Sequence, residues 1–415
     1  MELKKYKLGD VADIVNGATP STHNSENYDG SIIWITPKDL SGQKQKIIRR
    51  GQRNISEIGF NNCSAQMIPP YNILMSSRAP IGLLAINENE CCTNQGFKNL
   101  VLDKSICDTD YMYYYLQFHM KEIEALGSGT TFKEISKSAL QGIEIRLPDL
   151  EKQRDIAKCL SDLDRKIELN KQINDNLEAM AKQLYDYWFV QFDFPNEEGK
   201  PYKSSGGVMV WNEKLKREIP SCFEVVNMGK LCDFRNGINY SKDETGNDYQ
   251  IVNVRNISSS RILLDGEDFD VITVPTSKAE NYVLKPDDII IARSGCPGST
   301  RLLLSSANTL FCGFIICCSP NDSSMRNYLV YCLKQLEGTN ATTSGGSILQ
   351  NVSQDTLKGL HVIVPKKQII DKFNKTIELI FARMLNCLKE SKALTKQRDE
   401  LLPLLMNGQA SVNSD

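Results

Sequence analysis

The stretch that decides the fold is DLEKQRDIAKCLSDLDRKIELNKQINDNLEAMAKQLYDYWFV, residues 149–190, which contains no proline or glycine. Apolar side chains recur along it at alternating steps of four and three residues, the spacing of a heptad seam. Pro148 and Asp149 give a start signal and Pro195 gives a stop, so the pattern predicts one long helix. The seam positions are Ile156, Leu160, Leu163, Ile167, Asn170, Asn174, Leu177, Ala181, Leu184 and Trp188.

A second long stretch near the end of the chain carries a matching seam. Its positions are Phe373, Ile377, Ile380, Met384, Cys387, Ser391, Leu394, Arg398, Leu401 and Leu405. We expect the two helices to bury these faces against each other in antiparallel fashion; the alternative is that each helix caps its own globule. Asn170 and Asn174 lie in the middle of the first seam. They would either be buried amides that fix the register of the helix pair, or be solvated where the helices pack loosely. Pro403 is expected to interrupt the end of the second helix.

The rest of the chain repeats itself at an offset near 217 residues. Leu8–Gly17 returns as Met228–Gly237, and the turn and strand Pro70–Met75 return as Pro286–Ile291. Further matches pair Ile33–Thr36 with Gln250–Asn253, Gly96-Phe97 with Gly313-Phe314, Tyr111 and Tyr114 with Tyr328 and Tyr331, and Pro148 with Pro365. The chain is therefore interpreted as a duplication.

Short apolar β-type runs, glycine and proline turns and a tyrosine-rich helical segment predict an α/β (α+β) globule in each copy. The expected fold is a tandem repeat of two similar globular domains, separated by two long helices that pair as an antiparallel coiled coil with pseudo-twofold symmetry. The expected divisions are globular domain 1 (1–148), helix 1 (149–194), junction and globular domain 2 (195–365), helix 2 (366–408) and a tail (409–415).

Composition excludes several classes of protein. The 415 residues are 41% hydrophobic and 24% charged, with no apolar run long enough to span a membrane. The charged N-terminus lacks a signal-peptide core, and 13 cysteines without a Cys-x-x-Cys pair argue against disulfide frameworks and zinc sites. We therefore expect a cytoplasmic protein, with Cys91, Cys92, Cys312, Cys317 and Cys318 as small buried hydrophobes.

Catalytic motifs are not convincing anywhere in the sequence. Ser294–Thr300 is glycine-containing but lacks the lysine of a phosphate-binding loop. Ile68-Pro69-Pro70-Tyr71 is reminiscent of an amino-methyltransferase motif, but Ile68 cannot accept a hydrogen bond from a target amine. We predict no catalytic residue, no metal and no cofactor, and an independent methyltransferase is disfavoured.

Net charge offers no global attraction to nucleic acid, because the formal value is −2. Between Lys38 and Arg53, however, six basic residues stand against the single acid Asp39. This run is either a solvated loop or a local phosphate-binding patch. Two similar but unequal globules suit duplex DNA that carries two separated half-sites, each read by one globule.

Several segments together resemble the specificity subunit of Type I restriction–modification systems. They are Leu8-Gly9-Asp10; Gly127–Thr131 leading to Ile135-Ser136; Ile145–Pro148 with Gln153 and Ile156-Ala157; and Tyr187–Phe192 followed by Ile219–Val225. The resemblance covers nearly the whole chain. The second copy departs from the family pattern after Pro365, where Lys366-Lys367-Gln368 replaces an acidic run.

The resemblance implies a non-catalytic subunit that carries the DNA address for two methyltransferase (modification) subunits using S-adenosylmethionine, which dock on the helical region. Two ATP-dependent translocase/nuclease (restriction) subunits would complete the restriction form. The alternative is the DNA-recognition subunit of an orphan modification or phage-defence complex lacking a nuclease.

Residues expected to contact DNA are polar side chains at strand ends and loops, since base edges are read by Arg, Lys, Asn and Gln. In the first domain they are Thr36, Lys38, Ser77, Arg78, Asn94, Gln95, Thr130, Thr131 and Lys133. In the second they are Asn253, Arg255, Asn256, Arg293, Ser294, Arg301, Ser344 and Ser347. Phosphate affinity is expected from Lys44, Lys46, Arg49 and Arg50.

Overall fold

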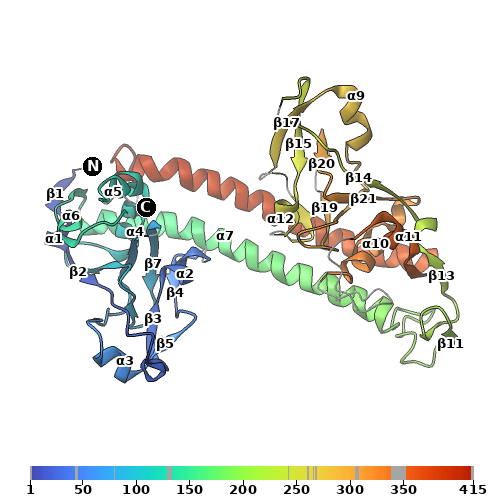
Figure 1. The fold of residues 1–415 in the computed structure, drawn as a ribbon, viewed down its shortest axis with the longest axis horizontal. Helices are drawn as coiled ribbons and strands as arrows, with labels where there is room; N and C mark the ends of the chain where they lie inside the picture. Colours follow the sequence, from blue (N-terminus) through green and yellow to red (C-terminus); the bar gives the residue numbers. More distant parts are fainter. Residues whose placement is uncertain are drawn as a thin grey trace. The chain divides into compact units, whose positions relative to one another are not determined.

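The computed structural model describes residues 2–42, 45–78, 80–128, 133–241, 243–258, 261–264, 266, 269–303, 308–337 and 352–412 (Figure 1). The chain divides into two compact units. Unit 1 is Met1–Leu169 with Glu390–Asp415, and unit 2 is Asn170–Lys389. Each of the two long helices therefore supplies residues to both units.

Unit 1 is built on a five-stranded sheet. Its order is β2 (Ala12–Asn16), β9 (Lys98–Leu102), β6 (Ile73–Ser77), β7 (Ile81–Asn87) and β4 (Ile47–Ile48), antiparallel except for the parallel β7–β4 pair. A three-stranded sheet has the order β5 (Asn54–Ile55), β3 (Tyr28–Ile35) and β8 (Cys92–Thr93), and β1 (Lys4–Lys7) pairs with β10 (Glu144–Leu147). The helical segments are α1 (Leu8–Val11), η1 (Ser25–Asn27), α2 (Pro37–Ser41), α3 (Glu57–Asn61), α4 (Thr109–Phe118), α5 (Met120–Ala125) and α6 (Lys137–Gln141).

Unit 2 repeats this topology strand for strand. The five-stranded order is β14 (Cys232–Asn236), β21 (Ile315–Pro320), β18 (Ile289–Ala292), β19 (Thr300–Leu303) and β16 (Leu263–Leu264), again with only the last pair parallel. β17 (Asp270–Val274), β15 (Asn247–Val252) and β20 (Thr309–Phe311) form the three-stranded sheet, and β13 (Glu224–Asn227) pairs with β22 (His361–Val364). The duplication and the mixed α/β class predicted from the sequence are confirmed.

Several helical segments of unit 2 occupy the same places in the chain order as helices of unit 1. The helical segments of unit 2 are the π-helical turn η2 (Asp186–Val190), η3 (Met228–Lys230), α8 (Val254–Ser258), α9 (Thr276–Ala279), η4 (Glu280–Tyr282), η5 (Ser323–Met325), α10 (Arg326–Lys334) and α11 (Gln354–Gly359). The hairpin β11 (Met209–Asn212) and β12 (Arg217–Pro220) precedes the repeated part.

The central strands are buried because their sequences are continuously apolar. β18 reads IIIA and β6 reads ILMSS, and every residue of both is buried. Such runs belong to strands that are covered on both faces. In unit 1 one face packs against Tyr111 and Tyr114 of α4, and the other packs against Leu40 of α2.

The two long helices are α7 (Leu150–Tyr185), continued by η2, and α12 (Lys367–Met406), drawn green and red in Figure 1. Asp149 caps α7 by accepting a hydrogen bond from the Lys152 backbone N–H at 2.9 Å. The expected break at Pro403 is wrong: α12 continues through it to Met406. Proline is tolerated there because only the final turn follows it, and the Pro403 carbonyl still accepts from Asn407 N at 3.0 Å.

None of the predicted seam residues is exposed. In unit 1, Asp164 pairs with Arg398 at 2.8 Å and Lys166 with Glu390 at 2.7 Å, so the two helices run antiparallel there. Seam residues also belong to the hydrophobic core of each unit. Ile156 and Leu160 cluster with Leu405 and with the sheet, while in unit 2 Phe373 lies against Phe189 at a ring distance of 5.0 Å. The helices therefore both pair with each other and pack on the globules, so the two alternatives expected from the sequence apply together.

Buried amides lie within the seam as expected. Asn170 is 5% exposed and Asn174 is 1% exposed, so the alternative of solvated amides is wrong. Within the described residues, Asn174 Oδ1 has no hydrogen-bond partner. An unsatisfied buried carbonyl costs stability, which fits a role in fixing register.

All 13 cysteines are free thiols. Cys91, Cys92, Cys312, Cys317 and Cys318 are buried, as predicted. Burial raises the pKa of Cys91 and Cys317 to about 12, so both remain protonated hydrophobes at neutral pH.

Candidate nucleic-acid interface

Three segments that are distant in sequence meet at one edge of unit 1. We define the first turn edge as Thr36–Lys38, Ser77–Arg78 and Asn94–Phe97. Ser77 N donates to Gly96 O at 2.7 Å, and Asn94 N donates to Ile35 O at 3.0 Å, at the end of β3. The predicted side chains at strand ends in the first domain are thus brought together.

Unit 2 builds a corresponding edge from the same elements. The second turn edge is Asn253–Arg255, Arg293–Gly295 and Cys312–Ile315. Arg293 N donates to Phe314 O at 2.8 Å, and Cys312 N donates to Val252 O at 3.0 Å. A Cβ on Gly295 would lie 3.0 Å from Val254 Cγ1, so these segments are in close contact.

Backbone hydrogen bonds correct the residue-by-residue correspondence between the two edges. Gly17 N donates to Phe97 O at 3.4 Å, as Gly237 N does to Ile315 O at 3.1 Å. Together with the bonds above, this pairs Phe97 with Ile315 and Gly96 with Phe314. The sequence match of Gly96-Phe97 with Gly313-Phe314 is therefore wrong by one residue. The offset is 217 at β15, 216 at β18 and 218 at β21, and identity alone could not show where the residues were lost and gained.

Both edges need glycine at the end of the neighbouring strand. A Cβ on Gly17 would lie 1.8 Å from Asn94 O, and one on Gly237 would lie 2.1 Å from Cys312 O. Real Cβ contacts are never so short, so the repeated Asn-Gly sequence is explained by the close passage of the turn backbone.

Charge is distributed differently at the two edges. Arg78 lies 3.8 Å from Glu134, which also pairs with Lys98 at 3.2 Å. In unit 2, Asp270 accepts from Asn253 Nδ2 at 2.7 Å and pairs with Arg255. Arg293 is exposed, and within the described part of the chain its guanidinium forms no ion pair. The second edge therefore presents one free cation beside a neutralised pair.

The basic run 38–53 is largely neutralised by acids from elsewhere in unit 1. Lys46 lies 2.6 Å from Asp110 and 2.8 Å from Ser161, and its side chain is only 15% exposed. Arg49 pairs with Glu88, and Arg53 makes two 3.0 Å hydrogen bonds to Asp29 that hold the pKa of that carboxyl below its usual value. Among the described residues of this run, Lys38 and Arg50 are exposed and their side chains form no ion pair.

The predicted contact residues differ in exposure. Lys38, Arg49, Arg50, Gln95, Lys133, Arg255 and Arg293 are exposed, and Thr36, Lys46, Arg78, Asn94, Asn253 and Ser294 are half-buried. Ser77, Asn256 and Arg301 are buried. Lys44, Thr130, Thr131, Ser344 and Ser347 lie outside the described residues.

Buried members of this set have structural partners. Arg301, 6% exposed, pairs with Glu337 and also donates to Thr300 O. Asn256 Oδ1 accepts from Asn253 N at 2.8 Å, and Ser77 Oγ donates to Gly96 O at 3.2 Å. These three and Lys46 hold the edges and the sheet in place, so they are not suited to touching DNA directly.

Two aromatic residues at the second edge were missed by the sequence argument. Phe314 is 64% exposed and Tyr240 is 38% exposed. Partial burial raises the pKa of Tyr240, and the nearby Asp270 carboxylate raises it further. Phe314 was hidden because the one-residue offset matched it to Phe97, which is completely buried.

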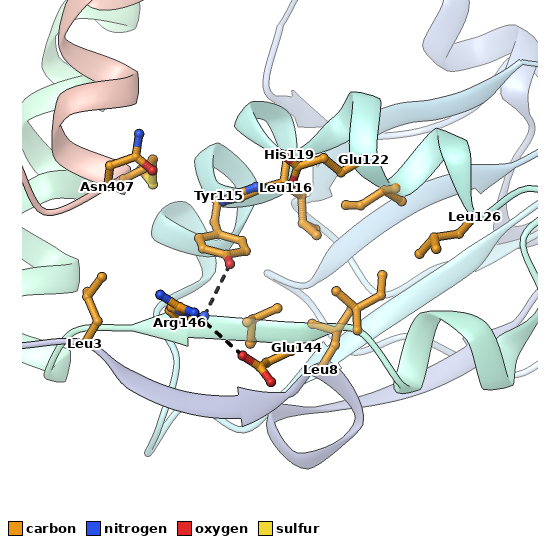
Figure 2. Close-up of a pocket in the computed structure, with 14 residues that line it drawn as sticks. Leu3, Leu8, Tyr115, Leu116, His119, Glu122, Leu126, Glu144, Arg146 and Asn407 are labelled. Atoms are coloured by element: carbon orange, nitrogen blue, oxygen red, sulfur yellow. Dashed lines mark hydrogen bonds and ion pairs between the residues drawn. The ribbon is translucent and has the colours of Figure 1, made fainter.

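A pocket of about 550 Å³ opens elsewhere on unit 1, beside the β1–β10 pair (Figure 2). Its polar groups are engaged with one another. Tyr115 Oη accepts from Arg146 N at 3.3 Å, Glu144 lies 4.0 Å from Arg146, and His119 pairs with Glu122 at 2.6 Å. Leu3, at its rim, corresponds to Phe223 of unit 2, where Phe194 stacks on that ring at 4.9 Å.

Comparison with known protein families decides the assignment. The family model described as the Type I restriction modification DNA specificity domain matches twice, at residues 1–179 and 220–398. This chain belongs to the Type I restriction–modification specificity subunits. The two matches coincide with the two copies found by internal repetition.

Relatives of this specificity subunit match along its whole length. The Type I restriction enzyme MjaIX specificity subunit of Methanocaldococcus jannaschii is 32% identical over 98% of this chain and 93% of its own. The HindI specificity subunit of Haemophilus influenzae is 26% identical over 98% and 99%. In structure, the S subunit from M. genitalium superposes with a TM-score of 0.59 at 18% identity, covering 100% of this chain and 97% of that one, which supports the fold.

The protein is accordingly the non-catalytic DNA sequence-specificity subunit of a Type I system. Specificity subunits of this kind associate with modification and restriction subunits. Among the described residues no group of His, Cys, Asp and Glu gathers as metal ligands would, and no helix has the length and apolar character to cross a bilayer.

Proposed function

We propose that this specificity subunit reads an asymmetric, bipartite DNA target, with one half-site for each recognition domain, residues 1–148 and 195–365. The observation that carries the proposal is the pair of turn edges. The same strands and hydrogen bonds build both edges, yet the side chains on them differ. Equivalent frames with different polar groups suit the reading of different bases.

Base contacts are assigned to the predicted residues that remain accessible at the edges. In domain 1 these are Thr36, Lys38, Arg78, Asn94, Gln95 and Lys133, and in domain 2 Asn253, Arg255, Arg293 and Ser294. Arg50, which is exposed and carries an uncommitted charge, would bind phosphate. Arg293 is the strongest base-reading candidate because its guanidinium is accessible, and guanine offers two acceptors to it.

The assembly we propose contains two methyltransferase subunits that use S-adenosylmethionine and dock on the flanks of α7 and α12, with two ATP-dependent translocase/nuclease subunits in the restriction form. Exposed apolar side chains on these helices, such as Leu169 at 47% and Leu379 at 70%, favour such docking. We place this assembly in the cytoplasm, where the 13 free thiols would stay reduced.

Exchange of residues 1–148 for the equivalent segment of a relative tests the proposal. The core of unit 1 also includes Ile156, Leu160, Leu405 and Met406, which lie outside the exchanged segment. The relative that donates the segment should therefore have the same residue types at these four positions. Methylation of host DNA, mapped by sequencing, should change in one half-site and remain the same in the other. A change in both half-sites would contradict independent reading.

A further inference from the structure

Phe314 lies at the second turn edge with its side chain 64% exposed, although the residues around it are packed in the core. Phe311 and Ile315 on either side are completely buried. Its carbonyl accepts from Arg293 N at 2.8 Å, and Ile315 N donates to Cys312 O at 2.9 Å. The ring is therefore held in solvent by an ordered turn and is not a side chain of a loose loop.

The turn does not need an aromatic residue in order to fold. Gly96 occupies the same place in unit 1, where Ser77 N donates to its carbonyl at 2.7 Å just as Arg293 N does to Phe314. The frame thus forms without any side chain at this point. A large apolar ring exposed where structure does not require it marks a contact surface.

The neighbours of Phe314 are those of a surface for nucleic acid. Arg293, whose backbone N–H donates to the Phe314 carbonyl, is exposed, and Asn253 and Arg255 lie on the same edge. Tyr240 adds a second, 38% exposed ring close to Cys312. An exposed ring between groups that can bind guanine and adenine is suited to the one apolar feature of the major groove, the thymine methyl group.

We propose that Phe314 contacts a thymine 5-methyl group in the half-site read by domain 2, and thereby determines specificity at that position. This inference rests on the proposed function. It also implies an asymmetry between the domains, because Gly96 gives domain 1 no apolar group at the matching place. At that place, domain 1 would be indifferent to the methyl group.

The test uses the full chain assembled with its methyltransferase subunits and the target found by methylation mapping. Each thymine of the domain 2 half-site is replaced in turn by uracil, which lacks only the methyl group. For the wild type, one replacement should weaken binding about fourfold, the value expected for removal of one buried methyl group. Phe314→Ala should cause a similar or larger loss on thymine DNA and no further loss on that uracil DNA.

Val208→Ala is the matched control, since Val208 is also 64% exposed in unit 2 but lies outside the edge. It should bind like the wild type. The inference is overturned if Phe314→Ala binds normally, if its loss adds to that of uracil, if specific and non-specific DNA weaken equally, or if only assembly with the methyltransferase is impaired. Failure of the wild-type complex to select any target would instead refute the proposed function.

Discussion

Lys46 provides the sharpest test of the structure against the sequence, because the two assign it different roles. The sequence places it in a phosphate-binding run. In the structure its Nζ lies 2.6 Å from Asp110 Oδ1, 2.8 Å from Ser161 Oγ and 5.0 Å from the centre of the Tyr114 ring. It therefore connects the 38–53 segment to α4 and α7, and its substitution should affect stability before DNA binding.

The magnitude follows from partial burial. An exposed ion pair contributes about 0.2–1 kcal/mol, and breaking a fully buried one costs about 3–5 kcal/mol. The Lys46 and Asp110 side chains are 15% and 22% exposed, between these limits. With a cation–π contribution of about 0.5–1 kcal/mol, we expect Lys46→Met to destabilise unit 1 by about 2 kcal/mol, because Asp110 loses its partner.

Urea unfolding would measure this loss, with Trp34 as the reporter. The chain has 3 tryptophans, and Trp188 and Trp211 belong to unit 2, so both are changed to phenylalanine in the background protein. Asp110→Asn completes a double-mutant cycle, in which a coupling energy of about 1–2 kcal/mol is expected.

DNA binding by the assembled complex supplies the contrast. Lys46→Met should leave the dependence of affinity on salt unchanged, whereas Arg50→Ala should reduce the slope by about one, the contribution of one phosphate contact. A Lys46→Met protein with native stability and a reduced salt slope would refute the assignment and restore the phosphate contact.

Three further outcomes are expected. Asn174→Leu should raise the thermal stability of unit 2, since it removes a buried oxygen without a partner in the described structure and such groups cost about 1–3 kcal/mol; a lower melting temperature would contradict this. Arg293→Ala should weaken binding by about 1–3 kcal/mol and relax one base position. Arg301→Ala should instead lower the stability of unit 2, because it breaks a largely buried ion pair with Glu337, which keeps only its more exposed partner Lys334 among the described cations, and base preference in a target library should be unchanged. Burial raises the pKa of Cys91, Cys92 and Cys107 from about 9 to about 12, so these thiols ionise first in the unfolded chain. The free energy of unfolding should therefore be intact below pH 9 and fall as the pH rises towards 12. A value that stays constant over this range in chemical unfolding would argue against the burial of these thiols.

The sequence predicted most reliably what depends on periodicity. The 4,3 spacing located the start of α7 and both ends of α12 to within two residues, because a helix of this length shows its buried face repeatedly. Helix 1 was expected to reach residue 194, whereas α7 with its continuation η2 ends at Val190. It could not show that the helix survives Pro403, since a proline near the last turn removes few hydrogen bonds and its effect depends on local packing. Nor could it show that Gln153 is buried to bind Asp108 N at 2.9 Å, Ile106 O and Pro148 O, which ties α7 to the sheet domain.

The site was predictable only in part, because residue type places a side chain at a strand end without revealing its partners. Arg293 and Arg301 were equivalent in the sequence argument. Their ion pairs in the structure distinguish them. The guanidinium of Arg301 pairs with Glu337, whereas the guanidinium of Arg293 forms no ion pair within the described chain. The basic run 38–53 shows the same effect, because Asp29, Glu88 and Asp110 come from outside it. Charge counted along the chain therefore overestimates the charge that is available to DNA.

The mispaired Phe314 shows why duplication alone cannot define function. Alignment of the two copies rewards identical residues, so it matched a buried phenylalanine with an exposed one. Backbone hydrogen bonds match Phe97 with Ile315, which are both core residues, and leave Phe314 opposite Gly96. A core is retained between copies because any change in volume is costly, whereas a reading surface is free to diverge. The positions at which the two units differ within an identical hydrogen-bonded frame are therefore the positions at which different bases would be read.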